Sequence, residues 1–188
     1  MNDIESHYKQ EHGRFLIEIK LRDIMQLFNS LDPSPFHEKD LDDDAEHYIV
    51  GTVREFPLKT PLKLVIHIPP AAVTAKPEGF IQQAIHNYFE YKAQVTEREL
   101  KHILWQGRVS LIIGLLFLFS CISARQLIAG LGQGTFYEIL QEGLLISGWV
   151  AMWRPIQTFL YDWWPIRMMG DVYKKLSTLD IEVRMALE

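Results

Sequence analysis

The densest group of side chains that could do chemistry is the run DLDDDAEH, residues 40–47. On a helix, Asp43 and Asp44 share a face with His47, because they precede it by four and three residues. A carboxylate and an imidazole on one face could bind a divalent cation. Acidic residues also gather in the first turn of a helix, where they cap free N–H groups and complement the helix dipole. We favour capping, and binding of a metal by Asp43, Asp44 and His47 remains the open alternative.

Other catalytic and ligand-binding patterns are absent from the sequence. The seven histidines show neither H-x-x-x-H nor H-E-x-x-H spacing, and no G-x-S-x-G, G-x-G-x-x-G or P-loop motif occurs. The one cysteine, Cys121, lies inside an apolar run, which excludes an intramolecular disulfide and a cysteine-based zinc site. We therefore predict no catalytic residue and no cofactor, and we expect that the protein is not an enzyme.

Charge is unevenly distributed along the 188 residues, whose net charge is −5. Residues 1–60 hold thirteen Asp and Glu against seven Lys and Arg. Binding to nucleic acid requires a basic patch that neutralises phosphates, and the sequence has no basic cluster. Nucleic acid is therefore excluded as a partner.

A long apolar segment predicts a membrane-spanning helix. Residues 109–124 carry no charge, and the apolar stretch extends to Leu131, for about 34 Å of helix across a hydrocarbon core of about 30 Å. A second apolar stretch follows at 136–153, after a glycine-rich reversal at 130–135. We predict a transmembrane helical hairpin over residues 108–164, with the lipid bilayer as its partner.

The hairpin prediction sets position i level with position 265 − i. Arg125 then lies level with Leu140, between Glu138 and Glu142, and an ion pair is the least costly arrangement for these charges in lipid. An ion or proton path is the alternative. Small residues allow helices to approach closely in lipid. The predicted packing residues, either within the hairpin or between protomers, are Gly114, Gly143, Ser147 and Ala151, with Gly114 opposite Ala151.

The ends of the hairpin indicate its orientation. Lys and Arg flank both outer ends, at 98–108 and 154–175, whereas the connecting turn has none except Arg125 on its approach. By the positive-inside rule both termini are cytoplasmic, and the polar start of the sequence predicts no signal peptide. Aromatic residues collect at the headgroup level of membranes, and the predicted interfacial belt comprises Trp153, Tyr161, Trp163 and Trp164.

The remaining sequence predicts a small cytoplasmic two-layer α+β domain. Apolar and polar residues alternate strictly over 14–21, 62–68 and 181–188, which predicts about three strands with one dry face. Helical spacing at 22–31 and 40–56 predicts two covering helices. The predicted order is a tail at 1–13, the α+β domain at 14–77, a juxtamembrane stalk helix at 78–107, the hairpin and belt at 108–164, and a C-terminal helix and strand at 165–188. Residues 69–77 are read as a linker, and 177–188 complete the domain.

Three runs resemble an uncharacterised family of bacterial two-span inner-membrane proteins. They are LFNSLDPSPFHEKDLDDDAEHYIV, GRVSLIIGLLFLFSC and EGLLISGWVAMWRPIQTFLYDWWPIR, of which MWRP and LYDWWP are the most specific. The resemblance implies a bacterial inner-membrane location and no activity.

Our functional prediction is a membrane-anchored interaction or assembly module, as a homo-oligomer or with a membrane-protein partner. An oligomeric pore or transporter built from the hairpins is the alternative, and an unrecognised membrane-associated enzyme is the third possibility.

Overall fold

The structure, a computed structural model, describes residues 7–35, 39–69, 78–132 and 134–185. The chain divides into two units: unit 1 comprises residues 1–95 and 169–188, and unit 2 comprises residues 96–168. Most of the predicted linker, residues 70–77, and the end of the last predicted strand, residues 186–188, lie outside the described residues.

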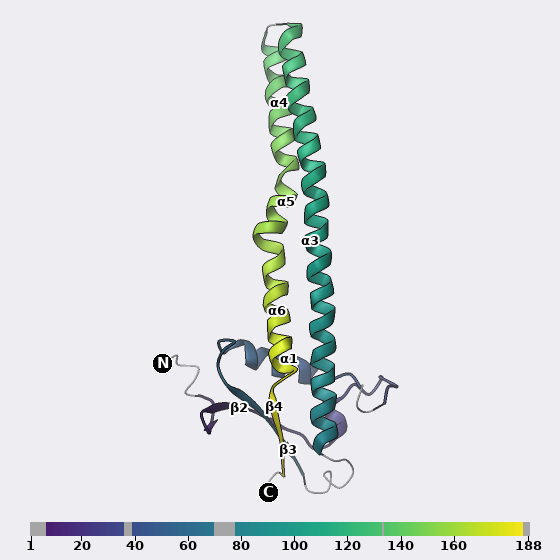
Figure 1. Ribbon diagram of the computed structural model, residues 1–188, viewed down its shortest axis with the longest axis vertical. Coiled ribbons are helices and arrows are strands. Elements are labelled where there is room, and N and C mark those ends of the chain that lie inside the picture. The colour runs from purple at the N-terminus through teal and green to yellow at the C-terminus, as the bar shows by residue number, and fades with distance from the viewer. Residues whose placement is uncertain (1–6, 36–38, 70–77, 133, 186–188) are drawn as a thin grey trace. The chain divides into compact units, whose positions relative to one another are not determined.

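Unit 1 contains a mixed sheet in the order β1-β2-β3-β4 (Figure 1). The three alternating segments form β2 (Arg14–Lys20), β3 (Leu62–Ile68) and β4 (Asp180–Met185), and both neighbouring pairs are parallel. The α+β class is therefore confirmed. A fourth strand, β1 (Gln10–Glu11), pairs antiparallel with β2 inside the predicted tail. The turn between them has positive φ at His12 and Gly13, as tight hairpin turns require.

Helices cover one face of the sheet in unit 1. Ile49 and Val53 of α1 (Asp43–Arg54), with Val172 and Leu176 of α6 (Trp163–Leu176), pack in one core that includes the β3 side chains. The predicted helix over 22–31 is wrong: only a 3₁₀ turn, η2 (Ile24–Leu27), forms there. Asp23 and Gln26 close a capping box around it, and the chain becomes extended at Phe28, which bridges to Leu41. The predicted second helix is α1, which is shorter at both ends.

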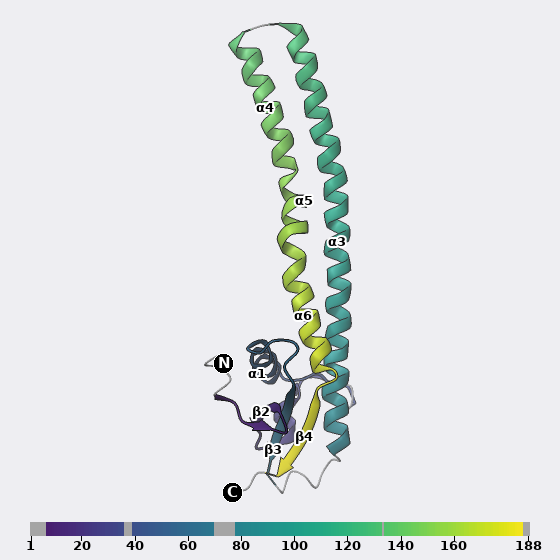
Figure 2. The ribbon, with the colours of Figure 1, turned by 60° about the vertical axis from the view of Figure 1, so that its left-hand side comes forward.

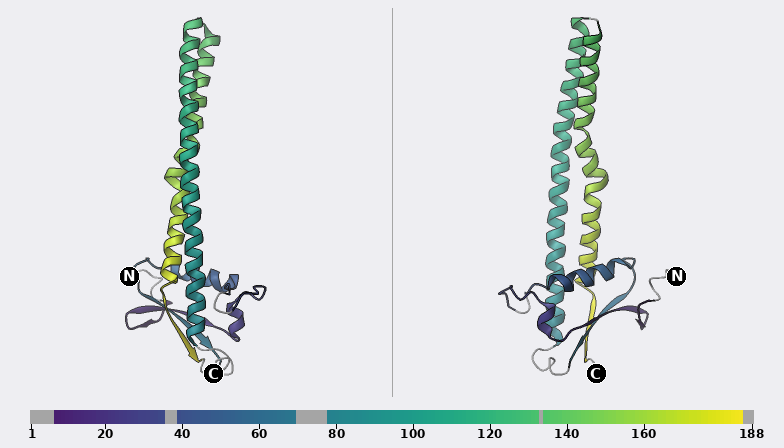
Figure 3. Two further views of the ribbon diagram at one scale, coloured as in Figure 1. Left: turned by 45° about the vertical axis from the view of Figure 1, so that its right-hand side comes forward. Right: turned by 180° about the vertical axis from the view of Figure 1, so that it is seen from behind.

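The predicted stalk helix is the beginning of one continuous helix, α3 (Glu78–Leu131) (Figure 3). Its first part is no free stalk, because apolar side chains from 81 to 93 are buried in unit 1. These are Ile81, Ala84, Ile85, Tyr88, Phe89 and Ala93. Their helical spacing therefore reports core packing against the sheet.

Unit 2 consists of two antiparallel helical limbs (Figure 2). One limb is α3 from Thr96 onward, and the other runs through α4 (Thr135–Ala151), α5 (Trp153–Gln157), the π-helical turn η4 (Thr158–Asp162) and the start of α6. Gly134 precedes α4 with φ +142, a conformation that glycine adopts readily. Pro155 has no N–H to donate to the carbonyl group of Ala151, and α4 ends at Ala151.

The expectation of two membrane spans requires correction. Within the described residues, one helix, Gly79–Leu131 in α3, is long and apolar enough to cross a membrane by length and composition. With 17 residues, α4 extends about 25 Å, which is shorter than a hydrocarbon core of about 30 Å. The antiparallel pairing of the limbs is observed, whereas a pair of full-length spans is not.

Candidate functional site

The acidic run at 40–47 caps α1. The side chain of Asp42 accepts a hydrogen bond from the backbone N–H of Asp44 at 3.1 Å, and Asp43 and Asp44 lie in the first helical turn. His47 is exposed on the next turn. In the described parts of the chain, no group of three or more His, Cys, Asp or Glu side chains could hold a metal ion. The acidic run therefore caps the N-terminus of α1, and the hypothesis of a metal site at Asp43, Asp44 and His47 gains no support.

Glu46, in the same run, forms a polar cluster that sequence analysis missed. Its carboxylate accepts hydrogen bonds from Tyr88 at 2.5 Å and Tyr173 at 3.0 Å, and Lys92 Nζ lies 3.1 Å away. We call these four residues the Glu46 cluster. Burial, reinforced by the carboxylate, raises the pKa of Tyr173 to about 12 and raises that of Tyr88 further. The cluster joins α1, α3 and α6 within unit 1 and keeps both phenols neutral.

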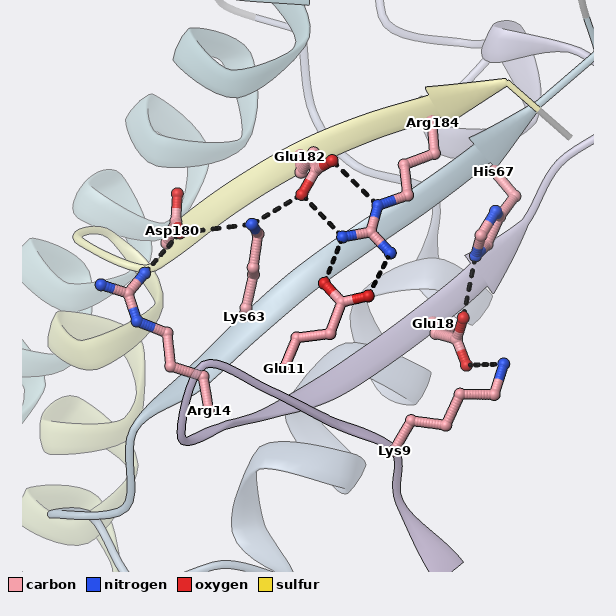
Figure 4. A network of polar contacts seen from close by, with 9 residues as sticks. All are labelled: Lys9, Glu11, Arg14, Glu18, Lys63, His67, Asp180, Glu182 and Arg184. Atoms are coloured by element: carbon pink, nitrogen blue, oxygen red, sulfur yellow. Dashed lines mark hydrogen bonds and ion pairs between the residues drawn. The ribbon is translucent and has the colours of Figure 1, made fainter.

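A network of charged side chains covers the other face of the sheet (Figure 4). Arg184 contacts Glu182 and Glu11, and Lys63 contacts Glu182 at 2.6 Å and Asp180 at 3.8 Å. Arg14 also pairs with Asp180, whereas Glu18 contacts Lys9 at 2.9 Å and His67 at 3.0 Å.

The charges of this network balance, and they lie over apolar residues. Four cations face four carboxylates, and hydrogen bonds from Arg184 and Lys63 lower the pKa of Glu182 to about 2. Leu16 and Val65 lie on the same face of the sheet and are 2% and 0% exposed. Because each charge in the network has a partner, the network has no net charge to offer a ligand, and it closes the second side of the sheet.

Small residues bring the two limbs of unit 2 together. A Cβ on Gly107 would lie 2.8 Å from Thr158 Cγ2, and one on Gly114 would lie 3.1 Å from the carbonyl oxygen of Ala151. Gly148 is buried against Leu118. The contacts of Gly107 and Gly114 both follow the register of i with 265 − i.

The predicted stripe of small residues on α4 is only partly at this contact. Ala151 lies against Gly114, but a Cβ on Gly143 would meet nothing within 4 Å, and Ser147 is exposed. Gly148, which sequence analysis did not select, takes the place of Ser147 at the contact. Its neighbours are Leu118 and Cys121.

The predicted ion pair at the far end of unit 2 is not formed. Arg125, Glu138 and Glu142 are all exposed, and among the described residues no salt bridge joins Arg125 to either glutamate. The three side chains lie on the surface of the two limbs, where they are open to a polar environment.

The surface of unit 2 is unusually apolar. Of the large hydrophobic side chains that are exposed in the described residues, 23 lie in unit 2 and 8 in unit 1. They occur on α3, for example Leu116 at 66% and Phe119 at 70%, and on α4, for example Ile146 at 63% and Val150 at 67%. This apolar surface, residues 109–153, exceeds what a chain in water normally exposes.

The predicted interfacial belt lies at one end of the apolar surface. Trp153, Tyr161 and Trp164 are exposed, and Trp163 is half-buried. The indole N–H of Trp163 donates to the carbonyl oxygen of Phe159 at 2.8 Å, and that of Trp164 lies 2.7 Å from Met168 Sδ. The polar edge of each of these two indoles thus has a partner while its ring contributes to the surface.

Comparisons of the chain with protein family models, with curated proteins and with solved structures gave no match.

Proposed function

We propose that the chain is a membrane-anchored interaction or assembly module of the bacterial inner membrane. In this proposal unit 2 inserts into the bilayer and unit 1 is a folded domain on the cytoplasmic side. The observation that carries the proposal is the exposed apolar surface of unit 2, since lipid is the environment in which such a surface is stable.

The sheet of unit 1 restricts how the chain crosses the membrane. β3 precedes α3 and β4 follows α6, yet they are paired strands of one sheet and so lie on the same side. If α3 crosses, the chain has to return before β4. We take α3 as the crossing helix and residues 135–157 as the returning segment, packed on α3 through Gly114 and Gly148.

Charge supports the cytoplasmic location of unit 1. Arg98, Lys101 and Arg108 lie on α3 within 13 residues of the point in the sequence where unit 1 ends, and Arg154 and Arg167 lie on the other limb. The opposite end, residues 125–142, carries Arg125 against Glu138 and Glu142. Lys and Arg favour the cytoplasmic side of a membrane, so this asymmetry orients the connecting turn outward.

The assignment as a module rests on the chemistry of unit 1. Its two polar constellations, the Glu46 cluster and the charge network, are internally paired, and each joins separate elements of the fold. Such contacts stabilise a domain and leave neither group of side chains free for catalysis. Association with copies of itself or with a membrane protein is the role that we propose for unit 1.

Membrane insertion is tested by carbonate extraction of membranes from cells that express the chain. We expect the native chain to stay in the pellet and the double variant Leu116→Arg, Phe119→Arg to shift to the supernatant. Each arginine at the middle of a span opposes insertion by about 2.5–3.5 kcal/mol. The matched control is Leu31→Arg, Leu58→Arg, which changes two exposed leucines of unit 1. A native chain that is released by carbonate would overturn the proposal.

The interaction role has a separate test. After gentle solubilisation, the mass of the intact particle is measured and its protein components are identified. The proposal predicts several copies of the chain, or the chain with another protein. A particle that contains one copy and no other protein would contradict the role while leaving the anchor intact.

A further inference from the structure

The basic residues of unit 2 gather on two segments that lie side by side. Residues 98–108 of α3 and residues 154–168 of the other limb meet where Gly107 packs against Thr158. We call these two segments the basic band. Its cationic side chains are all exposed: Arg98, Lys101, Arg108, Arg154 and Arg167.

The basic band has a net charge opposite in sign to that of the whole chain. Its two segments hold five Lys and Arg against Glu99 and Asp162, and Glu97, which precedes the first segment, pairs with Lys101. The local net charge is therefore +2, whereas the whole chain carries −5. Lys101 and Arg108 are seven residues apart, so their side chains lie on one face of α3. The band is thus a local cationic surface on an otherwise acidic protein.

The contacts within the band leave its guanidinium groups open to the outside. Arg154 lies 3.9 Å from Asp162, and its side chain is still 67% exposed. Arg167 lies over the ring of Trp163, 6.0 Å from the centroid, a position that keeps the cation next to an aromatic face. Lys101 pairs with Glu97 at 2.9 Å, and its side chain is still 73% exposed. Among the described residues, no salt bridge joins a carboxylate to Arg98, Arg108 or Arg167.

The position of the band indicates what it binds. It adjoins the apolar surface directly, since residue 109 follows it on α3 and residue 153 precedes it on the other limb. In a bilayer, the layer next to the hydrocarbon is that of the phosphate groups, and tryptophan and tyrosine collect at this depth. Trp105, Tyr161 and Trp164 of the band are all exposed.

We infer that the basic band binds the phosphate groups of anionic phospholipids at the cytoplasmic surface of the membrane. The inference rests on the proposed function, because it requires unit 2 to be inserted. A lipid surface fits the band better than an acidic protein does, because the cations occur on both limbs, within about 20 Å along the helices, and are continuous with the apolar surface. Each Lys or Arg near such a surface contributes about 1 kcal/mol, or about five-fold in affinity.

The tryptophans of the chain provide the test. All five lie in unit 2, so intrinsic fluorescence reports on lipid next to this unit without labelling. The full chain is reconstituted in equal parts of phosphatidylglycerol and phosphatidylcholine, with brominated acyl chains on one lipid at a time. We expect brominated phosphatidylglycerol to quench more strongly, for a relative binding constant of about two to five. About 1 M salt, which shortens the Debye length to about 3 Å, should bring this ratio towards one.

Two charge-matched variants separate the band from the total charge of the chain. Arg108→Gln, Arg154→Gln, Arg167→Gln should lower the ratio towards one, whereas Lys20→Gln, Arg22→Gln, Lys59→Gln, at exposed positions of unit 1, should leave it unchanged. An equal fall of the phosphatidylglycerol-to-phosphatidylcholine binding ratio in both variants would overturn the inference. If the first variant does not fold, the salt titration of the native chain tests the inference: a binding ratio that is unchanged by salt would overturn it.

The failures of the two proposals are distinguishable. Equal quenching of the native chain by both brominated lipids would overturn the role of the basic band, and unit 2 would still be in contact with lipid. Binding of an acidic protein by the band would give this same result. Absence of quenching by either lipid would overturn the membrane anchor and the lipid-binding role together.

Discussion

Replacement of Gly148 by leucine should weaken the packing between α3 and α4. A Cβ at this position would lie 2.7 Å from Leu118 Cδ1, 3.3 Å from Cys121 Cβ and 3.4 Å from Leu118 Cα. The Leu118 methyl group can rotate away, so alanine should be tolerated. A leucine side chain reaches the backbone of α3, and overpacking of this kind opposes folding by about 1–3 kcal/mol.

The matched control is Gly143→Leu on the same helix, where an added Cβ meets nothing within 4 Å. Both replacements gain the same helix propensity, about 1 kcal/mol relative to glycine, so the difference between the variants isolates the packing. The free energy of unfolding is measured in detergent by titration with sodium dodecyl sulfate. Tryptophan fluorescence follows unit 2, and Trp149 is adjacent to the mutated residue.

We expect Gly148→Leu to be less stable than Gly143→Leu by about 1–3 kcal/mol. Equal stability of the two variants would refute the packing of the limbs through Gly148. A larger loss in Gly143→Leu would instead support the stripe of small residues that the sequence spacing suggested.

Three further predictions concern unit 1. Glu46→Ala should lower the free energy of unfolding of unit 1 by about 2–4 kcal/mol, because two phenols and an ammonium group lose a partly buried carboxylate. Glu46→Gln, which retains an acceptor, should lose less, and thermal denaturation followed by circular dichroism compares the two variants. Truncation after Leu179 removes β4 with the buried Ile181. Residues 21–77 should then be cleaved rapidly by protease, while unit 2 should stay in the membrane. A truncated chain as protease-resistant as the native one would contradict the pairing of β4 with β3. The pKa values of Tyr88 and Tyr173 are raised, so these phenols keep their protons in the folded state at a pH where the unfolded state has lost them. Their contribution to the free energy of unfolding should be full below about pH 10 and fall as the pH rises towards 12. Tyr88→Phe should flatten this pH dependence in alkaline unfolding curves.

Strict alternation predicted the three long strands of unit 1, because side chains of a strand with one dry face alternate between core and charged network. β1 was not predicted, because a strand of two residues is too short to show an alternating pattern. The positive φ values at His12 and Gly13 depend on the turn itself. The apolar spacing over 22–31 matches a helix, but local capping by Asp23 and Gln26 and the bridge between Phe28 and Leu41 favour an extended chain after one turn.

Some of the functional features could likewise be predicted from the sequence, and others could not. The apolar runs at 109–131 and 136–153 predicted the apolar surface, and the aromatic residues at 153–164 predicted its edge, because both are local properties of the chain. The Glu46 cluster joins residues at 46, 88, 92 and 173, and only the folded chain brings them together. Spacing alone selected Gly143 and Ser147, but the rotation of α4 about its axis depends on all of its packing, which places Gly148 at the contact.

Cysteine labelling in intact cells tests the membrane anchor and its orientation most directly. In a Cys121→Ser background, single cysteines replace Thr135, at the start of α4, and Ser30 and Thr178, which are exposed in unit 1. A membrane-impermeant maleimide should label Thr135→Cys from outside the cytoplasmic membrane and should label Ser30→Cys and Thr178→Cys only after lysis. Labelling of Ser30→Cys or Thr178→Cys in intact cells, or protection of Thr135→Cys, would contradict the proposed anchoring.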